Sequence, residues 1–541
     1  MRNGNLAAVS PPRPTSAPSV SLAEVAALAG APLGSWSGGS PFLHGVSLDS
    51  RSVRPGDLYA ALPGFTTHGA AFARQAVDNG AAAILTDSAG ARDTRGVDVP
   101  VVVVDDPRAV LGEVASYVYG DPAFSLTLLG ITGTNGKTTT AYLLESGLRA
   151  LGVATGLIGT VETRIGASRL KSVRTTPEAT DLHAIFAVMR EEGASAVVME
   201  VSSHALAQHR VDGAVFDVAV FTNLSQDHLD FHASMDDYFA AKASLFTPAH
   251  SRRGVVCVDD EWGQRLLREA QVPVVTVASV PTRSGIRVDY RIRPGQWPSF
   301  VLEGPTGDLT LQCHLPGQFN VVNTALAAVT LLEAGHPLDA VGRALAHEPV
   351  VPGRMEVVTP TVPDPEGDPR CIVDFAHTPA AVEAALRALR PTTPGRLVVV
   401  LGAGGDRDHG KRPGMGVAAA HWADDIIVTD DNPRSEDPAA IRAEVMAGAG
   451  DAAAAPPHPH IAAARPDTRT RYTSDAGRAQ HIARAVRLAR EARPAADNTV
   501  VVLGKGHESG QEIAGVVHPF DDRDALRAAL DGVPYEPELR P

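Results

Sequence analysis

The sequence predicts an α/β protein of three domains in which parallel strands alternate with helices. Short apolar runs rich in β-branched residues alternate with Ala/Leu-rich stretches along the 541 residues, which is typical of βαβ units. A chain of this length is too long to fold around a single hydrophobic core, so several domains are expected. Pro/Gly-rich segments near residues 122 and 351 mark two boundaries. We therefore expect domains at 21–122, 123–350 and 351–541, preceded by a tail at 1–20.

The apolar runs are the expected buried strands. Several of them end in Gly, Asp or Asn, and they lie at 101–104, 126–131, 196–201, 218–222, 255–258, 397–401, 426–429 and 500–503. Ligands of doubly wound sheets bind beyond the carboxyl ends of the strands. Polar residues that directly follow these runs are therefore the first candidates for function.

Two segments are expected to lack regular structure. Residues 1–20 are rich in Pro, Ser and Ala and have no continuous apolar stretch of the kind a secretory signal needs. We predict a disordered tail there. Residues 447–466 are rich in Ala, Pro and His without periodicity, which predicts a flexible surface insertion rather than a metal site.

Bulk composition excludes several classes of partner. The formal net charge of −14 argues against nucleic acid and anionic membranes, which need a basic surface. No apolar run approaches the roughly 18 residues of a membrane-spanning helix. The three cysteines are far apart and form no CxxC pair, which fits a reducing compartment and buried thiols. We therefore expect a cytoplasmic protein, not inserted in a membrane, with small-molecule partners.

Lysine is rare in this chain. There are 43 arginines and only five lysines, at positions 137, 171, 242, 411 and 505. Where Arg has replaced Lys at ordinary solvated positions, the remaining lysines are enriched where a primary amine is chemically necessary. These lysines are therefore candidates for chemistry, with chance as the alternative for any single one.

The strongest motif lies where strand 126–131 runs into a loop and then into a helix expected at 141–151. Glycines let backbone N–H groups turn toward a phosphate, and the helix N-terminus adds a favourable field. The lysine of such a loop reaches the β and γ phosphates, and the next hydroxyl binds Mg²⁺. The spacing departs from the usual GxxxxGK(S/T), so we predict a variant ATP-binding loop, the alternative being a glycine-rich helix start without nucleotide. Its residues are Gly133, Thr134, Asn135, Gly136, Lys137, Thr138 and Thr139, with Thr138 as the Mg²⁺ ligand.

Three further residues are candidate metal ligands. Glu200 closes a buried strand, and His228 follows strand 218–222. A carboxylate at a strand end is otherwise a helix cap or a surface group. Lys242 follows fourteen residues after His228. A buried lysine in an acidic, metal-bearing site needs its amine neutralised, and carbon dioxide does this by forming a carbamate, which turns the cation into a ligand.

These motifs resemble those of the Mur ligase family, ATP-dependent enzymes that form amide bonds in peptidoglycan precursor synthesis. The resemblance spans residues 45 to about 530. It implies an N-terminal UDP-sugar-binding α/β domain, a central P-loop ATPase domain with a mostly parallel sheet, and a C-terminal Rossmann-like domain. Phe375 stands where the family commonly has Tyr. The motifs, in order, are LDSR (48–51), GTNGKTT (133–139), TTP (175–177), EVSSHAL (200–206), QHR (208–210), FTNLSQDHLDFH (221–232), Lys242, GQFN (317–320), PGRME (352–356), DFAHTP (374–379), GGDRD (404–408), DNPR (431–434) and GKGHE (504–508).

The resemblance also implies residue roles. The UDP-sugar would be contacted by Leu48, Ser50, Phe65, Thr66 and Thr67, and the muramoyl-dipeptide by Thr175, Thr176, Ser202, Gln208 and Arg210. ATP would be contacted by Asn320, Arg354 and Asp374, in addition to the loop, and Lys242 would be carried as N6-carboxylysine. The added amino acid would be contacted by Arg407, Asp431, Asn432, Pro433, Arg434, Gly504 and Glu508.

The implied reaction is the addition of meso-2,6-diaminopimelate to the D-Glu γ-carboxyl of UDP-N-acetylmuramoyl-L-Ala-D-Glu, through an acyl phosphate, by a monomeric protein. Arg434 favours diaminopimelate, because a guanidinium grips its distal carboxylate with two parallel hydrogen bonds, whereas lysine offers only a like charge. Three alternatives stay open. They are a lysine-adding member of the family, a folylpolyglutamate synthetase, which would lack the N-terminal domain, and a nucleotide-binding regulator without catalysis.

Overall fold

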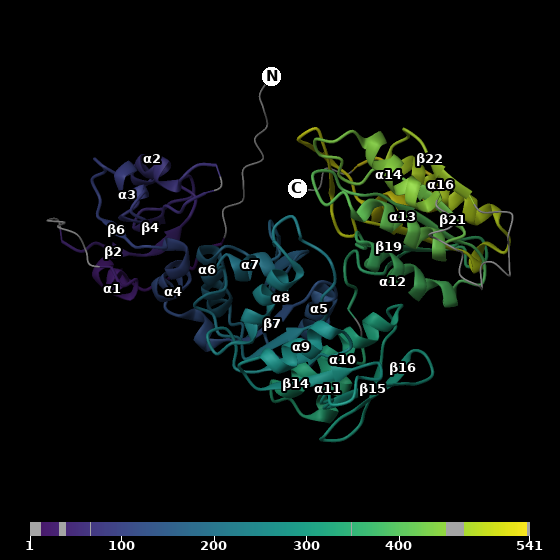
Figure 1. Ribbon diagram of the computed structural model, residues 1–541, viewed down its shortest axis with the longest axis horizontal. Coiled ribbons are helices and arrows are strands. Elements are labelled where there is room, and N and C mark those ends of the chain that lie inside the picture. The colour runs from purple at the N-terminus through teal and green to yellow at the C-terminus, as the bar shows by residue number, and fades with distance from the viewer. Residues whose placement is uncertain (1–11, 32–38, 65, 348, 451–469, 538–541) are drawn as a thin grey trace.

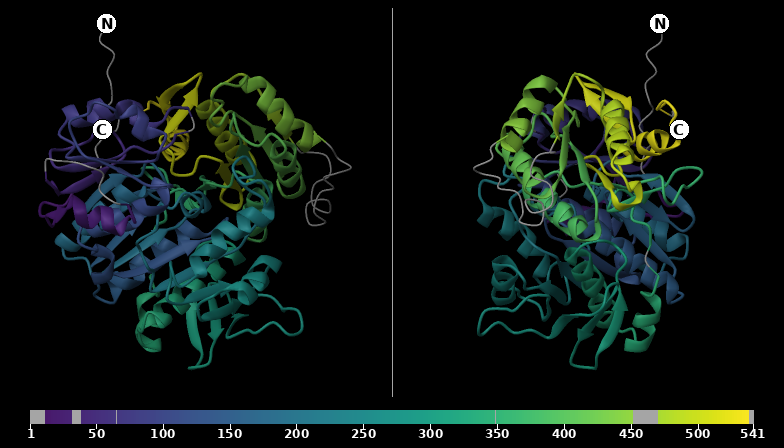
Figure 2. Two further views of the ribbon diagram at one scale, coloured as in Figure 1. Left: turned by 60° about the vertical axis from the view of Figure 1, so that its left-hand side comes forward. Right: turned by 90° about the vertical axis from the view of Figure 1, so that its right-hand side faces the viewer.

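The protein folds into three α/β bodies arranged in chain order (Figure 1). The structure is a computed structural model that describes residues 12–31, 39–64, 66–347, 349–450 and 470–537. In both views of Figure 2 the N-terminal and C-terminal bodies lie on the same side of the central one. The predicted α/β class is confirmed, while the exact domain boundaries stay a prediction.

The N-terminal body is built on a small parallel sheet. Its strands are β3 Gly45–Ser47, β4 Asp57–Ala60, β5 Ala83–Thr86 and β6 Val101–Val103, and its helices are α1 Leu22–Leu28, α2 Ala73–Asp78, α3 Gly90–Asp93 and α4 Pro107–Val118. Apolar side chains of α1 and α4 pack on one face of the sheet, and those of α2 pack on the other. A short antiparallel pair, β1 Val20–Ser21 and β2 Phe42–Leu43, lies beside it.

The tail predicted at residues 1–20 is not disordered where the structure describes it, from residue 12 onward. The guanidinium of Arg13 pairs with the buried carboxylate of Asp57 on β4 at 2.9 Å. The backbone N–H groups of Thr15 and Ser16 donate to the carboxylate of Glu191, each at 2.9 Å. The prediction for residues 12–20 was wrong because charged partners distant in sequence anchor this segment. Residues 1–11 lie outside the described part.

The central body carries a large mixed sheet. Its strands are β7 Thr127–Thr132, β8 Thr155–Ile158, β9 Glu162–Ile165, β10 Ser168–Lys171, β11 Ala196–Glu200, β12 Val218–Phe221, β13 Gly254–Cys257, β14 Val274–Ala278, β15 Tyr290–Pro294, β16 Ser299–Glu303 and β17 Leu309–Gln312. In the described residues their order is β10-β9-β8-β11-β7-β12-β13-β14-β15-β16-β17. Neighbours from β8 to β15 are parallel, and the pairs at both edges are antiparallel. The expected mostly parallel sheet is therefore present.

Helices cover both faces of this central sheet. They are α5 Lys137–Ala150, α6 Ala179–Glu191, α7 Ser203–Ala207, α8 Met235–Ala243, α9 Glu261–Glu269, α10 Gln318–Glu333 and α11 Leu338–Ala344. Apolar side chains of α5, α10 and α11 fill one face, and those of α6, α8 and α9 fill the other. The loops at the carboxyl ends of β7, β11 and β12 are left open to the neighbouring bodies.

The C-terminal body is a second doubly wound sheet. Its strands are β18 Glu356–Val358, β19 Arg370–Asp374, β20 Leu397–Leu401, β21 Asp425–Val428, β22 Thr470–Thr473 and β23 Thr499–Leu503, followed by the hairpin β24 Gly510–Ile513 and β25 Val516–Pro519. Its helices are α12 Pro379–Leu389, α13 Lys411–Trp422, α14 Pro438–Gly450, α16 Arg478–Glu491 and α17 Asp522–Asp531. The strand order is β18-β19-β23-β20-β21-β22, with β18 antiparallel to the rest. Helices α12 to α14 cover one face, and α16 and α17 cover the other.

Two expectations need correction at their ends. The helix expected at 141–151 begins at Lys137, because the N–H of Thr140 already bonds to the carbonyl of Gly136 at 2.9 Å. The first four residues of the insertion predicted at 447–466 belong to α14, since Gly448 and Ala449 are buried where that helix meets α13. Residues 451–466 lie outside the described part of the chain.

Two simpler expectations are met. All three cysteines are buried and form no disulfide. In the part of the chain that the structure describes, no helix has both the length and the apolar character needed to cross a membrane.

Candidate active site between the three bodies

The glycine-rich loop joins β7 to α5 at the carboxyl edge of the central sheet. Gly133 has a φ of 143° and Gly136 a φ of 89°, conformations that residues with a Cβ rarely adopt. A Cβ on Gly133 would lie 1.9 Å from Oγ1 of Thr222, and one on Gly136 would lie 2.5 Å from Oδ1 of Asn323. Gly136 caps α5 without a side-chain hydrogen bond. The N–H groups at the start of α5 are therefore available to an anion.

Two lysine amines converge on one carbonyl of this loop. Nζ of Lys137 donates to the backbone oxygens of Gly133 and Thr134, each at 2.9 Å, and Nζ of Lys242 donates to the same Gly133 oxygen at 2.8 Å. The buried Lys242 amine also lies 4.6 Å from the ring centroid of Tyr238. Burial and the charge of Lys137 hold the pKa of Lys242 well below its ordinary value. Lys242 is thus biased toward its neutral, nucleophilic form.

Glu200 ends β11 beside the loop and is 1% exposed. Its Oε2 accepts hydrogen bonds from the hydroxyls of Thr138 and Thr160, each at 3.0 Å, and its Oε1 accepts from the N–H of Thr160 at 2.8 Å. Thr138 and Glu200 form a pair of oxygen ligands of the kind Mg²⁺ prefers. Among the described residues, no three His, Cys, Asp or Glu side chains are grouped so as to hold a metal ion. The pair therefore fits Mg²⁺ only together with oxygens of a bound substrate or water.

His228 lies in the loop after β12 and has a φ of 55°. Burial lowers its pKa to about 4, so near neutral pH the ring is uncharged and keeps a lone pair that a metal can bind. Its ring centroid lies 4.8 Å from that of His204 and 6.0 Å from that of Tyr238. The Tyr238 ring therefore lies beside both the His228 ring and the Lys242 amine.

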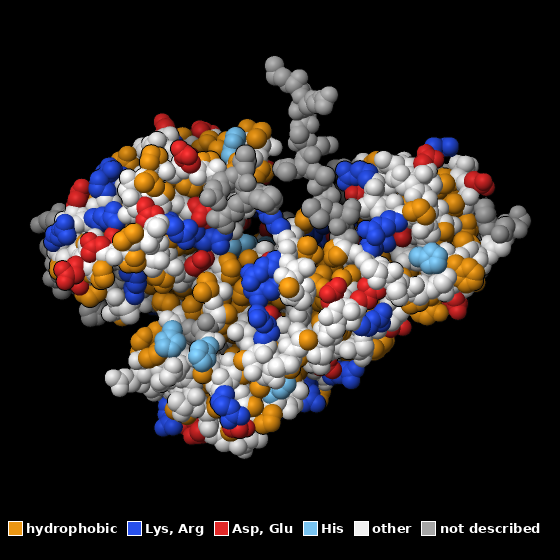
Figure 3. Space-filling model, turned by 180° about the vertical axis from the view of Figure 1, so that it is seen from behind, with side chains coloured by type: hydrophobic (Ala, Val, Ile, Leu, Met, Phe, Trp, Pro, Cys, Tyr) orange, Lys and Arg blue, Asp and Glu red, His pale blue; other side chains and the backbone are white. Residues whose placement is uncertain are grey.

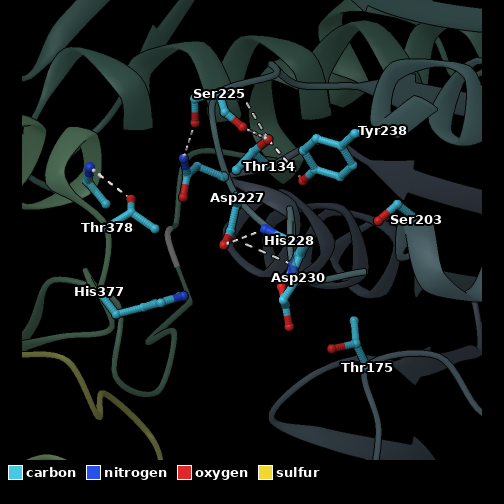
Figure 4. Close-up of polar contacts among 12 residues, drawn as sticks. Thr134, Thr175, Ser203, Ser225, Asp227, His228, Asp230, Tyr238, His377 and Thr378 are labelled. Atoms are coloured by element: carbon cyan, nitrogen blue, oxygen red, sulfur yellow. Dashed lines mark hydrogen bonds and ion pairs between the residues drawn. The ribbon is translucent and has the colours of Figure 1, made fainter. Parts of the chain in front are cut away.

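The C-terminal body reaches this same loop. Figure 4 shows His377 pointing toward the loop that carries Asp227 and His228, and Nη1 of Arg407 lies 3.3 Å from Oδ2 of Asp230. Burial alone would raise the pKa of Asp227, but its interactions with neighbouring basic groups, first His228 and then His377 and Lys411, lower it overall. Figure 3 shows a hollow between the three lobes with Lys and Arg side chains around it. The candidate site therefore lies between bodies rather than inside one.

Three candidate dipeptide contacts form a network next to Glu200. The hydroxyl of Thr175 lies 3.0 Å from that of Thr160. Oγ1 of Thr176 donates to the backbone oxygen of Glu200 at 2.9 Å and lies 3.4 Å from Oγ of Ser202. These hydroxyls are thus connected to the candidate metal ligand.

The other two candidate dipeptide contacts lie at the junction with the N-terminal body. The guanidinium of Arg210 donates to Oε1 of Gln208 at 2.6 Å and pairs with Glu178 at 2.9 Å. Arg108, on α4, pairs with the same Glu178 at 3.2 Å and donates to the backbone oxygen of Gln208 at 3.3 Å. This network connects the first two bodies.

The candidate UDP-sugar residues are only partly brought together. Oγ of Ser50 donates to Oε1 of Gln75 at 2.7 Å, and Leu48 packs against the N-terminal core. Thr66 and Thr67 are exposed. Phe65 lies outside the described residues.

The candidate ATP contacts near the second boundary meet the loop. Nη2 of Arg354 donates to the hydroxyl of Thr138 at 3.3 Å, and its guanidinium lies 4.3 Å from the ring centroid of Phe375. The Phe375 ring, at a position where the family commonly has Tyr, therefore stacks with the Arg354 guanidinium. The carboxylate of Asp374 accepts two backbone N–H groups. Asn320 is buried, and its Oδ1 accepts from Asn323 at 3.2 Å.

Arg434 lies in the turn after β21 and has a φ of 53°. Its Nη1 donates to the backbone oxygen of Gly405 at 2.5 Å, and its Nε lies 3.3 Å from Oε2 of Glu512 on β24. The turn is tightly packed, because a Cβ on Gly405 would lie 1.9 Å from the backbone oxygen of Pro433. The guanidinium therefore already holds one carboxylate.

The loop after β23 packs against the loop after β21. The fully buried amine of Lys505 donates to Oδ1 of Asn432 at 3.0 Å and lies 3.3 Å from Glu508 and 3.6 Å from Asp431. Nδ2 of Asn432 donates to Oε2 of Glu508 at 2.9 Å. Gly504 has a φ of 115°, and a Cβ there would lie 2.5 Å from Oδ2 of Asp431. The structure thus gathers the predicted amino-acid contacts from these two loops.

Comparison with known proteins agrees with this architecture in all three bodies. Sequence models described as Mur ligase family, catalytic domain, Mur ligase middle domain, and Mur ligase, glutamate ligase domain match residues 42–119, 131–331 and 353–506. The chain belongs to the Mur ligase family. Because residues 42–119 match as well, a folylpolyglutamate synthetase, expected to lack this domain, is excluded.

Individual relatives of this Mur ligase cover nearly its full length. It is 52% identical over 524 residues to the UDP-N-acetylmuramoyl-L-alanyl-D-glutamate–2,6-diaminopimelate ligase of Streptomyces coelicolor, covering 96% of this chain and 98% of that protein. It is 47% identical to the ligase of the same name from Corynebacterium glutamicum, covering 91% and 92%. A solved structure with that name shares 31% identity and a TM-score of 0.65, covering 95% of this chain and 99% of the other.

Sequence reasoning missed several residues that shape the site of this Mur ligase. Thr160 binds Glu200 through both its N–H and its hydroxyl, and no sequence signal marks it. Asn323 could have been found, since it follows Asn320 by nearly one helical turn. Lys505 was noticed as one of five lysines, yet its place between two loops depends on the fold.

Proposed function

We propose that this Mur ligase joins meso-2,6-diaminopimelate to the D-Glu γ-carboxyl of UDP-N-acetylmuramoyl-L-Ala-D-Glu with hydrolysis of ATP to ADP and phosphate. The observation that carries the proposal is the Asp230–Arg407 pair, which connects the loop after β12, itself bonded to the glycine-rich loop, with the C-terminal loop that Arg434 contacts at Gly405. A phosphate site and a carboxylate-gripping site then face one hollow. The names of the full-length relatives support the same reaction.

The loop residues would hold the nucleotide. The free N–H groups at the start of α5 and the amine of Lys137 suit the β and γ phosphates. Lys137 would leave the Gly133 and Thr134 carbonyls and stabilise negative charge on the transferred phosphoryl group. Thr138 and Glu200 would hold Mg²⁺, which when bound neutralises phosphate charge and lets two anions approach. Asn320, Arg354 and Asp374 would contact the rest of ATP.

Lys242 is proposed to carry a carbamate. Two cations on the single carbonyl of Gly133 repel each other, and burial further disfavours charge on Lys242. A neutral amine adds to carbon dioxide and releases a proton, which gives an anionic ligand next to Lys137. His228, uncharged near neutral pH, would complete this second metal position.

The chain's own groups then explain the chemistry. A carboxylate is a poor electrophile, so its phosphorylation to an acyl phosphate prepares it for attack by an amine. Thr175, Thr176 and Ser202 would hold the dipeptide beside Glu200, and Gln208 and Arg210 would fix its other end. The site lies between three bodies, so their approach excludes water from the acyl phosphate.

Arg434 and Glu508 are proposed to select the acceptor. In this structure the Arg434 guanidinium is paired with the carboxylate of Glu512. The distal carboxylate of diaminopimelate would replace Glu512 in this ion pair. Glu508 suits the distal ammonium, while Arg407 suits the second carboxylate. The acceptor's reacting amine would then point toward the central body.

A phosphate-release assay tests the function. The purified protein receives UDP-N-acetylmuramoyl-L-Ala-D-Glu, ATP and Mg²⁺, with meso-diaminopimelate, its isomers or L-lysine as acceptor. We expect release that depends on meso-diaminopimelate. Release with lysine alone would instead assign the lysine-adding member of the family. Silence with every acceptor would favour the regulatory alternative and contradict the proposal.

The setting proposed for this reaction is the cytoplasm, where ATP and UDP-linked precursors are available, and the working unit is proposed to be a monomer. Each body contributes its own part of the hollow within one chain, so a second copy is not needed to complete the site. Sedimentation of the active protein at one monomer mass is the expected result, and a dimer that loses activity on dilution would contradict it.

A further inference from the structure

Arg478, on α16, lies beneath the two loops to which the proposed function assigns the amino acid. Its side chain is fully buried, and its Nε and Nη2 donate to the two carboxylate oxygens of Asp522, each at 2.7 Å. The same guanidinium donates from Nη1 to the backbone oxygen of Asp430 at 3.1 Å, and from Nη2 to that of Leu503 at 2.9 Å. Asp430 directly precedes the DNPR loop and Leu503 directly precedes the GKGHE loop.

The sheet itself does not join these two loops. Strand β20 lies between β21 and β23, so no ladder hydrogen bond connects the ends from which the loops leave. The spacing of the loops therefore depends on contacts outside this sheet. At their tips the bridges are the Lys505–Asn432–Glu508 network and the backbone hydrogen bonds between Arg434 and the hairpin strand β24. At their bases the bridge is Arg478.

We propose that Arg478 is a positioning residue for the amino-acid acceptor. By holding the carbonyls of Asp430 and Leu503 on one guanidinium, it sets the separation of Arg434 and Glu508, the groups that would grip the far end of diaminopimelate. This inference rests on the proposed function and adds a residue that touches neither the acceptor nor the nucleotide. Its effect is expected on acceptor binding and acceptor choice.

The guanidinium is suited to this task because of its shape. Four of its N–H groups are directed at fixed angles to Asp522 and the two carbonyls. A lysine keeps the charge opposite Asp522, but its single nitrogen cannot span both loop bases. Arg478→Lys therefore separates the bridging function from simple neutralisation of Asp522.

Arg396 provides a matched control at the opposite ends of the strands of the same sheet. Nε and Nη2 of Arg396 donate to the carboxylate of Asp425, at 2.7 and 2.6 Å, just before β20 begins. This is also a two-pronged pair with a buried Asp, but it lies at the amino ends of the strands, away from both loops. Arg396→Lys should reproduce any general loss of stability without changing acceptor binding.

The experiment measures KM for each substrate in the phosphate-release assay. For Arg478→Lys we expect KM for diaminopimelate to rise roughly 10- to 100-fold, while KM for ATP and for the UDP-dipeptide stays within about twofold. The preference for diaminopimelate over lysine should fall in parallel. In Arg478→Ala, millimolar guanidinium should restore part of the lost acceptor affinity. Arg396→Lys should keep all three KM values.

Other outcomes overturn the inference. If Arg478→Lys matches Arg396→Lys in every KM, or if its three KM values rise together, Arg478 has only a structural role. Should Arg478→Lys fail to fold, Asp522→Asn serves instead, since it keeps Arg478 and loosens its anchor, and an unchanged diaminopimelate KM there rejects the inference. A wild-type protein with no diaminopimelate-dependent release contradicts the proposed function itself, so the two failures are distinguished.

Discussion

Arg434 is the residue on which acceptor choice depends in this account. Arg434→Ala removes the group that would grip the distal carboxylate, so kcat/KM for diaminopimelate should fall roughly 10- to 100-fold, as for a charge-assisted hydrogen-bond pair. The rate with lysine, which lacks that carboxylate, should change much less. Steady-state kinetics with both acceptors give the comparison. Arg343→Ala, at a side chain 72% exposed, is the matched neutral substitution, and equal losses on both acceptors would refute the role of Arg434.

His183 links stability to pH. It is fully buried on α6, its Nε2 lies 2.9 Å from the backbone oxygen of Asp212, and burial lowers its pKa to about 4. Because the folded pKa is below the unfolded value, the unfolded chain takes up a proton first as pH falls below about 6.5. Protonation linked to His183 should therefore lower the free energy of unfolding by about 1–2 kcal/mol as the pH falls from 7 to 5.

Chemical denaturation at the two pH values measures this effect. His183→Gln keeps a donor for the Asp212 carbonyl and should flatten the pH dependence, whereas His44→Gln, at an exposed histidine, should leave it unchanged. Identical pH dependence in the wild type and His183→Gln would show that His183 does not contribute.

At the scale of elements, the glycine-rich loop depends on backbone space. In Gly133→Ala a Cβ would lie 1.9 Å from Oγ1 of Thr222, with φ at 143°, so the loop must move. A displacement of about 1 Å at reacting groups lowers rates about 100-fold, and ATP-dependent phosphate release should fall by at least that factor. Gly152→Ala has a φ of 81° but nothing within 4 Å, and should cost about 1–2 kcal/mol of stability without loss of activity. Similar activity in the two variants would contradict this account of the loop.

The segment 12–21 is a second element with a testable contribution. Arg13→Ala leaves the carboxylate of Asp57, whose side chain is 3% exposed, without its ionic partner, so the N-terminal body should lose about 3 kcal/mol of stability. Arg51→Ala breaks the exposed pair with Asp49 and should leave stability nearly unchanged. Thermal unfolding of both variants measures the difference, and equal shifts would show that the segment does not anchor this body.

Elements with a clear periodicity were predictable from sequence. The strands near 397–401 and 500–503 were found because long β-branched runs predict buried parallel strands. The anchoring of residues 12–20 was not, because Pro and Ser typical of disorder also occur in extended segments that a few distant side chains hold. Helix α14 extends to Gly450 because small residues allow close packing on α13, which local composition does not reveal.

For the whole molecule, the sequence could identify motif residues but not their mutual arrangement. The residues of the Arg407–Asp230 pair are 177 positions apart, and those of the Lys171–Ser509 contact between the central and C-terminal bodies are 338 apart. Spacing along the chain carries no information about such contacts. The family resemblance supplied the order of the bodies, and the structure supplied the hollow that they enclose.

The most direct test of the central claim is the mass of the reaction product. The purified protein is incubated with UDP-N-acetylmuramoyl-L-Ala-D-Glu, ATP, Mg²⁺ and an equal mixture of meso-diaminopimelate and L-lysine. The masses of the UDP-linked products are then measured by mass spectrometry. We predict one main product, heavier than the UDP-dipeptide by a single diaminopimelate residue and joined through the D-Glu γ-carboxyl. A product carrying lysine, or an unchanged UDP-dipeptide, would contradict the account.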